Sequence, residues 1–446
     1  MFRLFAAFVG LSPCGIKAIF TGLLLALLAS GSVQAGSSSL SLTMAIQQAL
    51  AANPDLQSFQ FKAQVLNSQL ASARLRPAYA LGIELENVAG SGEFNGFDQA
   101  DITVSLSSTL ELGGKRDARI AVAQRSRSHF DTQRELQSLS LLGEVTRRYI
   151  AVLSAQQQLA LANSAERLAK ETVNEVRKRT QAGASPKAEL RRAEAAAAQA
   201  HLSVYAQQQQ LRYLKIALAA LWGANEAGFD TVTGDLYSFG EDASFEALFS
   251  RLASNPAIQV YTAEQRLKEA ELTLAKTAAS ADINWSLGIK HMQASDDTAV
   301  VAGFTVPLFA GSRSSAALSS ATAASQAVAA RKTAALLKLR TQLFAAFNQR
   351  QQAIHIAGDL RKDIVPALQA ALQETQQAYQ RGRYGYIDYV SAQQELLTAQ
   401  RRLIAAASTA LRYGADIEQL TAQPLTASHY LSATTSAGPE LTEKQP

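Results

Sequence analysis

The chain has 446 residues, of which 48% are hydrophobic and 18% charged, and its formal net charge is +5 at pH 7. The positive charge forms neither a block nor a stripe interleaved with aromatic residues, so we exclude a nucleic-acid interface. The single cysteine, Cys14, lies near the N-terminus. Beyond it the chain offers no disulfide, thiol chemistry or zinc–thiolate site.

Residues 1–35 have the pattern of a secretory signal peptide. Arg3 and Lys17 supply positive charge, residues 19–29 form an apolar core, and Val33-Gln34-Ala35 has small residues at the spacing of a cleavage site. We favour cleavage over an uncleaved anchor, because the apolar core is too short to span a bilayer. Cys14 precedes that core, so it is not a lipid-accepting cysteine. No later apolar run reaches the length of a transmembrane helix, so any membrane insertion would use strands.

A first set of elements follows the leader. Leu42 to Arg76 is predicted to be a helix broken at Asn53-Pro54, with Thr43 capping its first turn. Tyr79–Val88 and Asp101–Leu112 alternate apolar and polar residues, which predicts two strands with one apolar face each.

A very long helix comes next. After Gly113-Gly114 the chain has no proline as far as Arg179 and is rich in helix-forming residues. About 65 residues at roughly 1.5 Å each predict a rod of about 100 Å. Gly183 suits its C-terminal end and Pro186 the first turn of another helix, which extends to about Trp222.

The same order then starts again. Asn255-Pro256 matches Asn53-Pro54 and precedes a helix, two more strands, and a second long helix that reaches Tyr379. We expect Pro366, which has no counterpart in the first half, to bend this helix. The predicted organisation is a signal peptide (1–35), a first repeat (36–223), a linker (224–243), a second repeat (244–422) and a disordered tail (423–446).

Both long helices carry apolar residues that step by threes, fours and sevens, as in coiled coils. Such stripes are expected to pack against neighbouring helices. They comprise Leu142, Val145, Tyr149, Val152, Leu159 and Ala162 in the first helix, and Leu336, Leu339, Leu343, Phe347, Ile354, Ala357 and Ile364 in the second.

The four strands are about ten residues long, the length that crosses a bilayer when tilted. Their apolar faces would meet lipid, and their polar faces a water-filled lumen. Four strands cannot close a membrane barrel, for which eight is the usual minimum, so several chains must share one, and three chains giving twelve strands is the simplest choice. The alternative is a small soluble sheet over a helical bundle, which explains the signal peptide and the long rods less well.

Three motifs in this duplicated frame resemble the outer-membrane efflux family typified by TolC, and within it the heavy-metal cation branch typified by CzcC. They are Leu110-Glu111-Leu112-Gly113-Gly114-Lys115-Arg116, Ala188-Glu189-Leu190-Arg191-Arg192-Ala193-Glu194, and residues 382–393 from Gly382-Arg383-Tyr384 onward. The resemblance covers roughly residues 42–422. It implies a mainly α fold with a membrane β-barrel portion: a homotrimer with a twelve-stranded barrel and a long α-helical tunnel. Such a duct lies in the outer membrane lipid of a Gram-negative bacterium, extends into the periplasm, and works with a periplasmic adaptor and an inner-membrane pump of the resistance-nodulation-division class.

The resemblance also implies site residues. Tyr379, Arg383 and Asp388 become candidates for a gate at the periplasmic end, although Ser391 stands where a second acidic residue is expected. Asp388 equally suits a helix N-terminus, where the dipole favours an acid. Adaptor docking is expected at the tips, with Gly183, Ser185, Gly382 and Tyr384 as candidates. The turns from barrel to tunnel are assigned to Gly113, Gly114, Pro307 and Gly311.

Nothing in the sequence favours an enzyme. It has no phosphate-binding glycine loop, its five histidines are scattered, and we expect no catalytic residue, cofactor or metal site. The predicted function is the outer-membrane duct of a tripartite pump exporting heavy-metal cations. Two alternatives stay open: the same duct serving drugs, other organic solutes or type I protein secretion, and a periplasmic coiled-coil structural protein without a pore.

Overall fold

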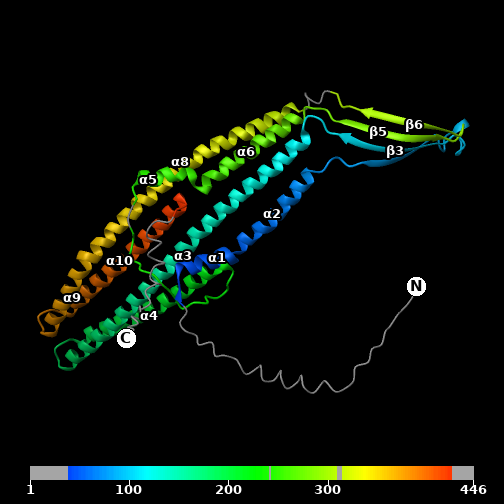
Figure 1. The fold of residues 1–446 in the computed structure, drawn as a ribbon. Helices are drawn as coiled ribbons and strands as arrows, with labels where there is room; N and C mark the ends of the chain where they lie inside the picture. Colours follow the sequence, from blue (N-terminus) through cyan, green and yellow to red (C-terminus); the bar gives the residue numbers. More distant parts are fainter. Residues whose placement is uncertain (1–38, 241–242, 309–313, 424–446) are drawn as a thin grey trace, which may run out of the picture. The chain divides into compact units, whose positions relative to one another are not determined.

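The order of elements along the chain is built twice from helix, strand, strand, long helix and helix (Figure 1). The computed structural model describes residues 39–240, 243–308 and 314–423, and every structural statement below refers to these residues. The predicted signal peptide, Gly311 and the predicted tail beyond Gln423 lie outside them. The first series comprises α1 (Leu42–Ala52), α2 (Pro54–Ala73), β2 (Ala80–Glu86), β3 (Asp101–Leu110), α3 (Lys115–Gln181) and α4 (Lys187–Ala219), which ends in a 3₁₀ turn, Ala220–Trp222.

The second series repeats this order. A short helix, α5 (Phe245–Ser250), precedes it. It comprises α6 (Pro256–Thr277), β5 (Ile283–Met292), β6 (Asp297–Thr305), α8 (Ser315–Asp359), a π-helical turn (Leu360–Ile364), α9 (Val365–Gln380) and α10 (Tyr386–Thr421). The predicted strands and long helices are thus present, with ends that differ by a few residues. Two details were wrong. Ser41, not Thr43, caps α1 by accepting a hydrogen bond from the Met44 amide, and Pro186 precedes α4 rather than lying in its first turn.

Equivalent asparagines join the helices in both halves. Asn53 accepts a hydrogen bond from the Leu56 amide at the start of α2, and its amide donates to the carbonyl of Leu221 (2.8 Å). Asn255 does the same at the start of α6, donating to the carbonyl of Leu420 at the end of α10 (2.7 Å). Each asparagine caps one helix N-terminus and satisfies a carbonyl near the end of another helix. The predicted Asn-Pro repeat is therefore a structural joint.

The four long strands form one antiparallel sheet in the order β2-β3-β5-β6. The register places Ile83, Val104, Ile289 and Val300 side by side in one cross-strand row, and Glu84, Thr103, Lys290 and Ala299 in the next. One face is therefore apolar and the other mainly polar, as predicted. Among the described strands, β2 and β6 each have a neighbour on one side only.

The long helices pack side by side and carry the main core. α3 packs against α2, α4, α6 and α10, and α8 packs against α6 and α10. Val145, Tyr149 and Val152 of the predicted stripe are fully buried. Figure 1 shows the sheet leaving one end of these helices and the α3–α4 and α9–α10 turns at the other.

The predicted bend at Pro366 takes the form of the π-helical turn Leu360–Ile364. Proline has no amide hydrogen and its ring clashes with the carbonyl four residues earlier, so a regular helix cannot continue there. The wider turn moves the apolar stripe by one position. Val365 is buried, with 8% of its surface exposed, whereas Ile364 is 43% exposed. The prediction that Ile364 lies in the helix seam was therefore wrong.

The linker takes part in a strand pairing that the sequence did not indicate. Two short strands, β1 (Ser39–Leu40) and β4 (Thr231–Val232), are parallel neighbours. Gln156 of α3 holds β4 with both ends of its side-chain amide, accepting from the Val232 amide (2.7 Å) and donating to the Val232 carbonyl (3.1 Å).

In the described part of the chain, no helix combines the length and the apolar character needed to cross a membrane.

Candidate functional site

The α3–α4 and α9–α10 turns form the end of the helices farthest from the sheet, and together we call them the tip (residues 171–195 and 374–395) (Figure 1). The two turns close in the same way. Gly183 and Gly382 both have left-handed backbones, with φ of 74° and 76°, which end each helix without a side-chain penalty. The amides of Ala184 and Arg383 reach back to the carbonyls of Arg179 and Ala378 (2.8 and 2.9 Å). Both predicted helix ends are confirmed.

Three tyrosines fill the inside of the tip. Tyr379, Tyr386 and Tyr389 are all buried, at 1%, 6% and 2% exposure, against Val173 and Val176 of α3. The rings of Tyr379 and Tyr389 stack, with centroids 5.4 Å apart and planes 13° apart. Tyr379, a gate candidate, therefore lies inside its own protomer.

Arg179 joins the two turns, and the sequence analysis did not single it out. Its guanidinium lies 4.4 Å from the centre of the Tyr379 ring, and its Nη1 donates a hydrogen bond to the backbone carbonyl of Tyr379. Burial raises the pKa of Tyr379, partly opposed by the positive charge of Arg179. Because the two residues are 200 positions apart, only the fold brings them together.

A second buried link lies further from the turns. The amide of Gln393 in α10 donates to the hydroxyl of Thr172 in α3 (2.9 Å), and that hydroxyl donates to the carbonyl of Leu168 (2.9 Å). A buried side-chain hydrogen bond of this kind fixes the relative position of two helices. The α3–α4 and α9–α10 hairpins are thus connected at both Arg179 and Thr172.

The remaining gate and docking candidates lie on the outside of the tip. Asp388 is exposed, and its carboxylate accepts a hydrogen bond from the Gly385 amide (3.0 Å) at the start of α10, as the helix N-terminal interpretation requires. Arg383 and Tyr384 are exposed, whereas Ser185 is half-buried and donates to Glu189. Their roles in gating or docking stay predictions.

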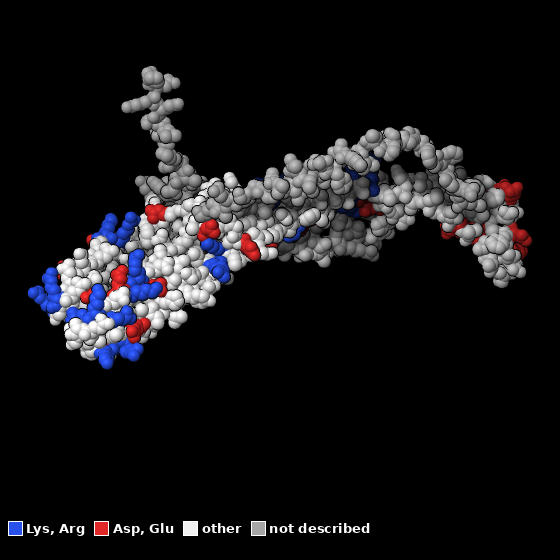
Figure 2. Space-filling model, turned by 90° about the horizontal axis from the view of Figure 1, so that it is seen from below, with Lys and Arg blue, Asp and Glu red and all other residues white. Residues whose placement is uncertain are grey.

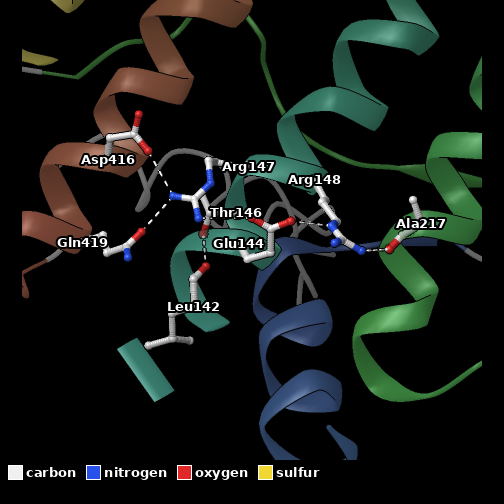
Figure 3. A network of polar contacts seen from close by, with 8 residues as sticks. All are labelled: Leu142, Glu144, Thr146, Arg147, Arg148, Ala217, Asp416 and Gln419. Carbon is white, nitrogen blue, oxygen red and sulfur yellow. Dashed lines mark hydrogen bonds and ion pairs between the residues drawn. The ribbon is translucent and has the colours of Figure 1, made fainter. Parts of the chain in front are cut away.

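A polar network on α3 involves Glu144, Arg147 and Arg148 (Figure 3). Arg147 donates to Asp416 (3.0 Å) and Gln419 (2.8 Å) of α10, and Arg148 donates to the carbonyl of Ala217 in α4. Glu144 accepts from both arginines. Burial acts to raise the pKa of Glu144, but hydrogen bonds from Arg148 and Arg147 outweigh it, so the pKa lies below its usual value. This network connects α3 to helices of both halves.

The strand-to-helix turn also follows the prediction. Gly113 and Gly114 have φ of 72° and 73°, and a Cβ on Gly113 would lie 2.3 Å from the hydroxyl of Ser280. Lys115 pairs with Asp282 (2.7 Å), whose carboxylate also accepts from the Leu112 amide (3.1 Å). Pro307 follows β6 outside regular structure. The assignment of these turns to a barrel–tunnel boundary stays a prediction.

Among the residues that the structure describes, no group of three or more histidine, cysteine, aspartate and glutamate side chains is placed to hold a metal ion. The tip offers a buried aromatic cluster, exposed charges and two backbone turns.

Comparison with known proteins agrees with this fold. The chain is 26% identical to the cobalt-zinc-cadmium resistance protein CzcC of Cupriavidus metallidurans over 68% of its own length and 72% of that protein. It is also 26% identical to the nickel-cobalt-cadmium resistance protein NccC of Alcaligenes xylosoxydans, over 65% of each chain, so it spans slightly less than two thirds of that relative. Its fold is similar to that of the outer membrane protein VceC of Vibrio cholerae, with a TM-score of 0.70, 19% identity, and coverage of 86% of this chain and 96% of VceC. The family model for outer membrane efflux proteins matches residues 45–224 and 249–423, and the chain belongs to that family.

Proposed function

We propose that three copies of this chain form a duct whose barrel crosses the outer membrane and whose helices extend into the periplasm. The observation that carries the proposal is the four-stranded sheet. Its apolar face is largely exposed in the single chain: Ile83, Val300 and Phe304 are 68%, 76% and 76% exposed. An apolar surface of this kind is stable against lipid and costly in water.

The polar face of the sheet supports a water-filled interior. Lys290 pairs there with Glu86 (2.6 Å) and Asp101 (2.9 Å), and Thr109 donates to Asn284 (2.7 Å). The outer strands β2 and β6 leave backbone groups unpaired, at several kcal/mol for each group in lipid. Joining β6 of one copy to β2 of the next removes both edges, and three copies would give twelve strands.

The proposed cargo is heavy-metal cations. Support comes from CzcC and NccC, which are named for resistance to cobalt, cadmium, zinc and nickel. A duct does not need a site that holds its cargo. The proposed partners are a periplasmic adaptor at the tip and an inner-membrane pump of the resistance-nodulation-division class.

Deletion of the gene from its host tests the function. We expect growth to become more sensitive to cobalt, zinc or cadmium, and plasmid-borne wild-type protein to restore it. Sensitivity to hydrophobic drugs in place of metals would show that the duct exports organic solutes. Loss of a secreted polypeptide would show that it serves protein export. Release of the mature protein from membranes by carbonate would contradict the duct and favour a coiled-coil structural protein.

A further inference from the structure

The segment between α2 and β2, residues 74–79, exposes both positive charge and apolar surface. Its sequence is Arg74-Leu75-Arg76-Pro77-Ala78-Tyr79. Leu75 is 67% exposed and Tyr79 is 71% exposed, and both arginines are exposed as well. Neither arginine side chain makes a hydrogen bond or ion pair with a residue that the structure describes.

The backbone of this segment is held by its neighbours. Arg116 of α3 donates from Nε to the carbonyl of Arg74 (2.9 Å), and Ser108 of β3 donates to the carbonyl of Ala78 (3.2 Å). Pro77 restricts the backbone between these two bonds. A ligand of the exposed side chains therefore meets a segment whose backbone is already ordered, which lowers the entropy cost of binding.

The apolar part of the segment continues the apolar face of the sheet. Tyr79 contacts Trp285 of β5, with ring centroids 6.3 Å apart and planes at 70°. Trp285 is paired in register with Phe304 of β6, which lies on the same face. Tyrosine and tryptophan are enriched where acyl chains meet headgroups. With this face in lipid, the aromatic row lies at that boundary, and Arg74 and Arg76 lie on its helix side.

Bases outnumber acids where the helices meet the strands. We call residues 74–79, 111–119 and 276–285 the junction. Its bases are Arg74, Arg76, Lys115, Arg116, Arg119 and Lys276, and its acids are Glu111, Asp117 and Asp282. Glu111 pairs with Arg119, and Asp282 pairs with Lys115. Asp117 lies in the first turn of α3, where the helix dipole favours an acid. The charge left for a ligand is therefore positive.

The opposite end of the sheet differs in charge. The β2–β3 loop contains Glu93 and Asp98, the β5–β6 loop contains Asp296, and neither loop contains lysine or arginine. Figure 2 shows Asp and Glu side chains at this end of the sheet. An anionic ligand is therefore favoured at the junction and disfavoured at the opposite loops.

We propose that residues 74–79 bind anionic phospholipids of the periplasmic leaflet of the outer membrane. This inference rests on the proposed function, because it requires the apolar face of the sheet to lie in lipid. Arg74 and Arg76 donate to the headgroup phosphate, and Leu75 and Tyr79 contact the upper part of the acyl chains. A soluble anion would neutralise the arginines but leave both apolar side chains in water.

Quenching of Trp285 fluorescence by brominated lipids tests the proposal. Trp222→Phe leaves Trp285 as the only tryptophan of the chain, and all proteins carry this change. Each purified trimer is reconstituted into bilayers of phosphatidylglycerol and phosphatidylcholine, with bromine on the acyl chains of one lipid at a time. The two quenching efficiencies give the relative association of the two lipids beside Trp285.

Three variants separate charge from structure. R74Q/R76Q removes both charges, and R74K/R76K keeps them. Arg212 and Arg402 are exposed on α4 and α10 without a side-chain ion pair to any described residue, so R212Q/R402Q is the matched control.

We expect phosphatidylglycerol to associate about tenfold more strongly than phosphatidylcholine beside Trp285, the equivalent of about 1.4 kcal/mol. R74Q/R76Q should remove most of this preference, whereas R74K/R76K and the control should keep it. Added salt should weaken the preference, because the attraction is electrostatic and lies near water.

Equal association of the two lipids in the wild type, or an unchanged preference in R74Q/R76Q, would overturn the inference. Loss of the preference on addition of inorganic phosphate would also overturn it, because the arginines would then bind a soluble anion. Failure of the proposed function has a different result, in which neither brominated lipid quenches Trp285 in any of the proteins.

Discussion

Single residues at the tip hold the two hairpins together, and Arg179 is the clearest case. It contributes a charged hydrogen bond to the Tyr379 carbonyl and a cation–π contact with the Tyr379 ring. The sequence predicted both helix ends from Gly183 and Gly382, because glycine is a local signal. It could not predict Arg179, because nothing in the neighbouring residues marks a contact across 200 positions.

Replacing Arg179 with alanine should loosen this end of the molecule. A partly buried cation–π contact and a charged hydrogen bond together suggest a loss of roughly 2 kcal/mol in the local opening free energy. Amide hydrogen exchange should then become about thirtyfold faster at residues 378–386 and stay unchanged near Arg147. The control is Arg177→Ala, which removes an exposed pair with Glu194 and an exposed hydrogen bond to Asn174 of the same helix. Equal acceleration in both variants would contradict the role of Arg179.

The glycine pair between sheet and helix allows packing and backbone effects to be separated. Gly113 and Gly114 have almost the same φ, but only a Cβ on Gly113 would meet a neighbour, Ser280. Gly114→Ala should cost about 1 kcal/mol of stability through its left-handed backbone alone. Gly113→Ala should cost clearly more, and G113A combined with S280G should return to the level of G114A.

Thermal unfolding, monitored by circular dichroism, measures the stability of G114A, G113A and the G113A/S280G double variant. Equal losses for the two single variants would show that the close approach of Ser280 does not constrain the turn.

At the scale of elements, the predicted helices and strands rested mainly on the periodicity of apolar residues and on the glycine and proline residues near helix ends. The alternation in β3 and β5 and the Asn-Pro joints are local patterns, so the strands and helix starts followed from the sequence. The π-helical turn at Leu360–Ile364 was anticipated only as a bend. Its exact form depends on how α8 and α9 pack against α10, which the sequence does not state.

The π-helical turn can be tested with a pair of variants at two neighbouring positions. Val365→Ala removes buried methyl groups and should cost roughly 2 kcal/mol. Ile364→Ala, at the neighbouring exposed position, should stay within about 0.5 kcal/mol of the wild type. Denaturant unfolding of both variants tests the helical register at the π-helical turn. A larger loss of stability for Ile364→Ala than for Val365→Ala would contradict the π-helical turn and support a regular helix with Ile364 in the buried stripe.

The network that joins α3 to α4 and α10 should depend on pH. The pKa of Glu144 is lowered in the folded state, so its contribution to stability is present above its unfolded pKa and is lost as the pH falls through its folded pKa. Glu144→Gln should cost up to about 1 kcal/mol at pH 7, since the ion pairs are partly exposed. The cost should disappear in acid, and melting temperatures between pH 7 and pH 3 measure it; a difference independent of pH would contradict this account of Glu144.

At the scale of the whole molecule, the edges of the sheet predict how copies meet. Glu84 of β2 and Ala299, Val301 and Gly303 of β6 lie on the same polar face. Within one chain β2 and β6 are three strand spacings apart, about 14 Å, which is too far for a disulfide. Glu84→Cys combined with cysteine at one of the three β6 positions should therefore give dimers and trimers on a non-reducing gel. Monomers in every combination would contradict the closed ring.

The central claim is that these chains enclose a water-filled path, and planar-bilayer recording tests it most directly. Purified trimer added to a lipid bilayer should produce discrete conductance steps, and the Arg179→Ala variant should alter their size or their frequency of closure. Trimers that enter the bilayer without any conductance step, for both the wild type and the variant, would contradict the duct.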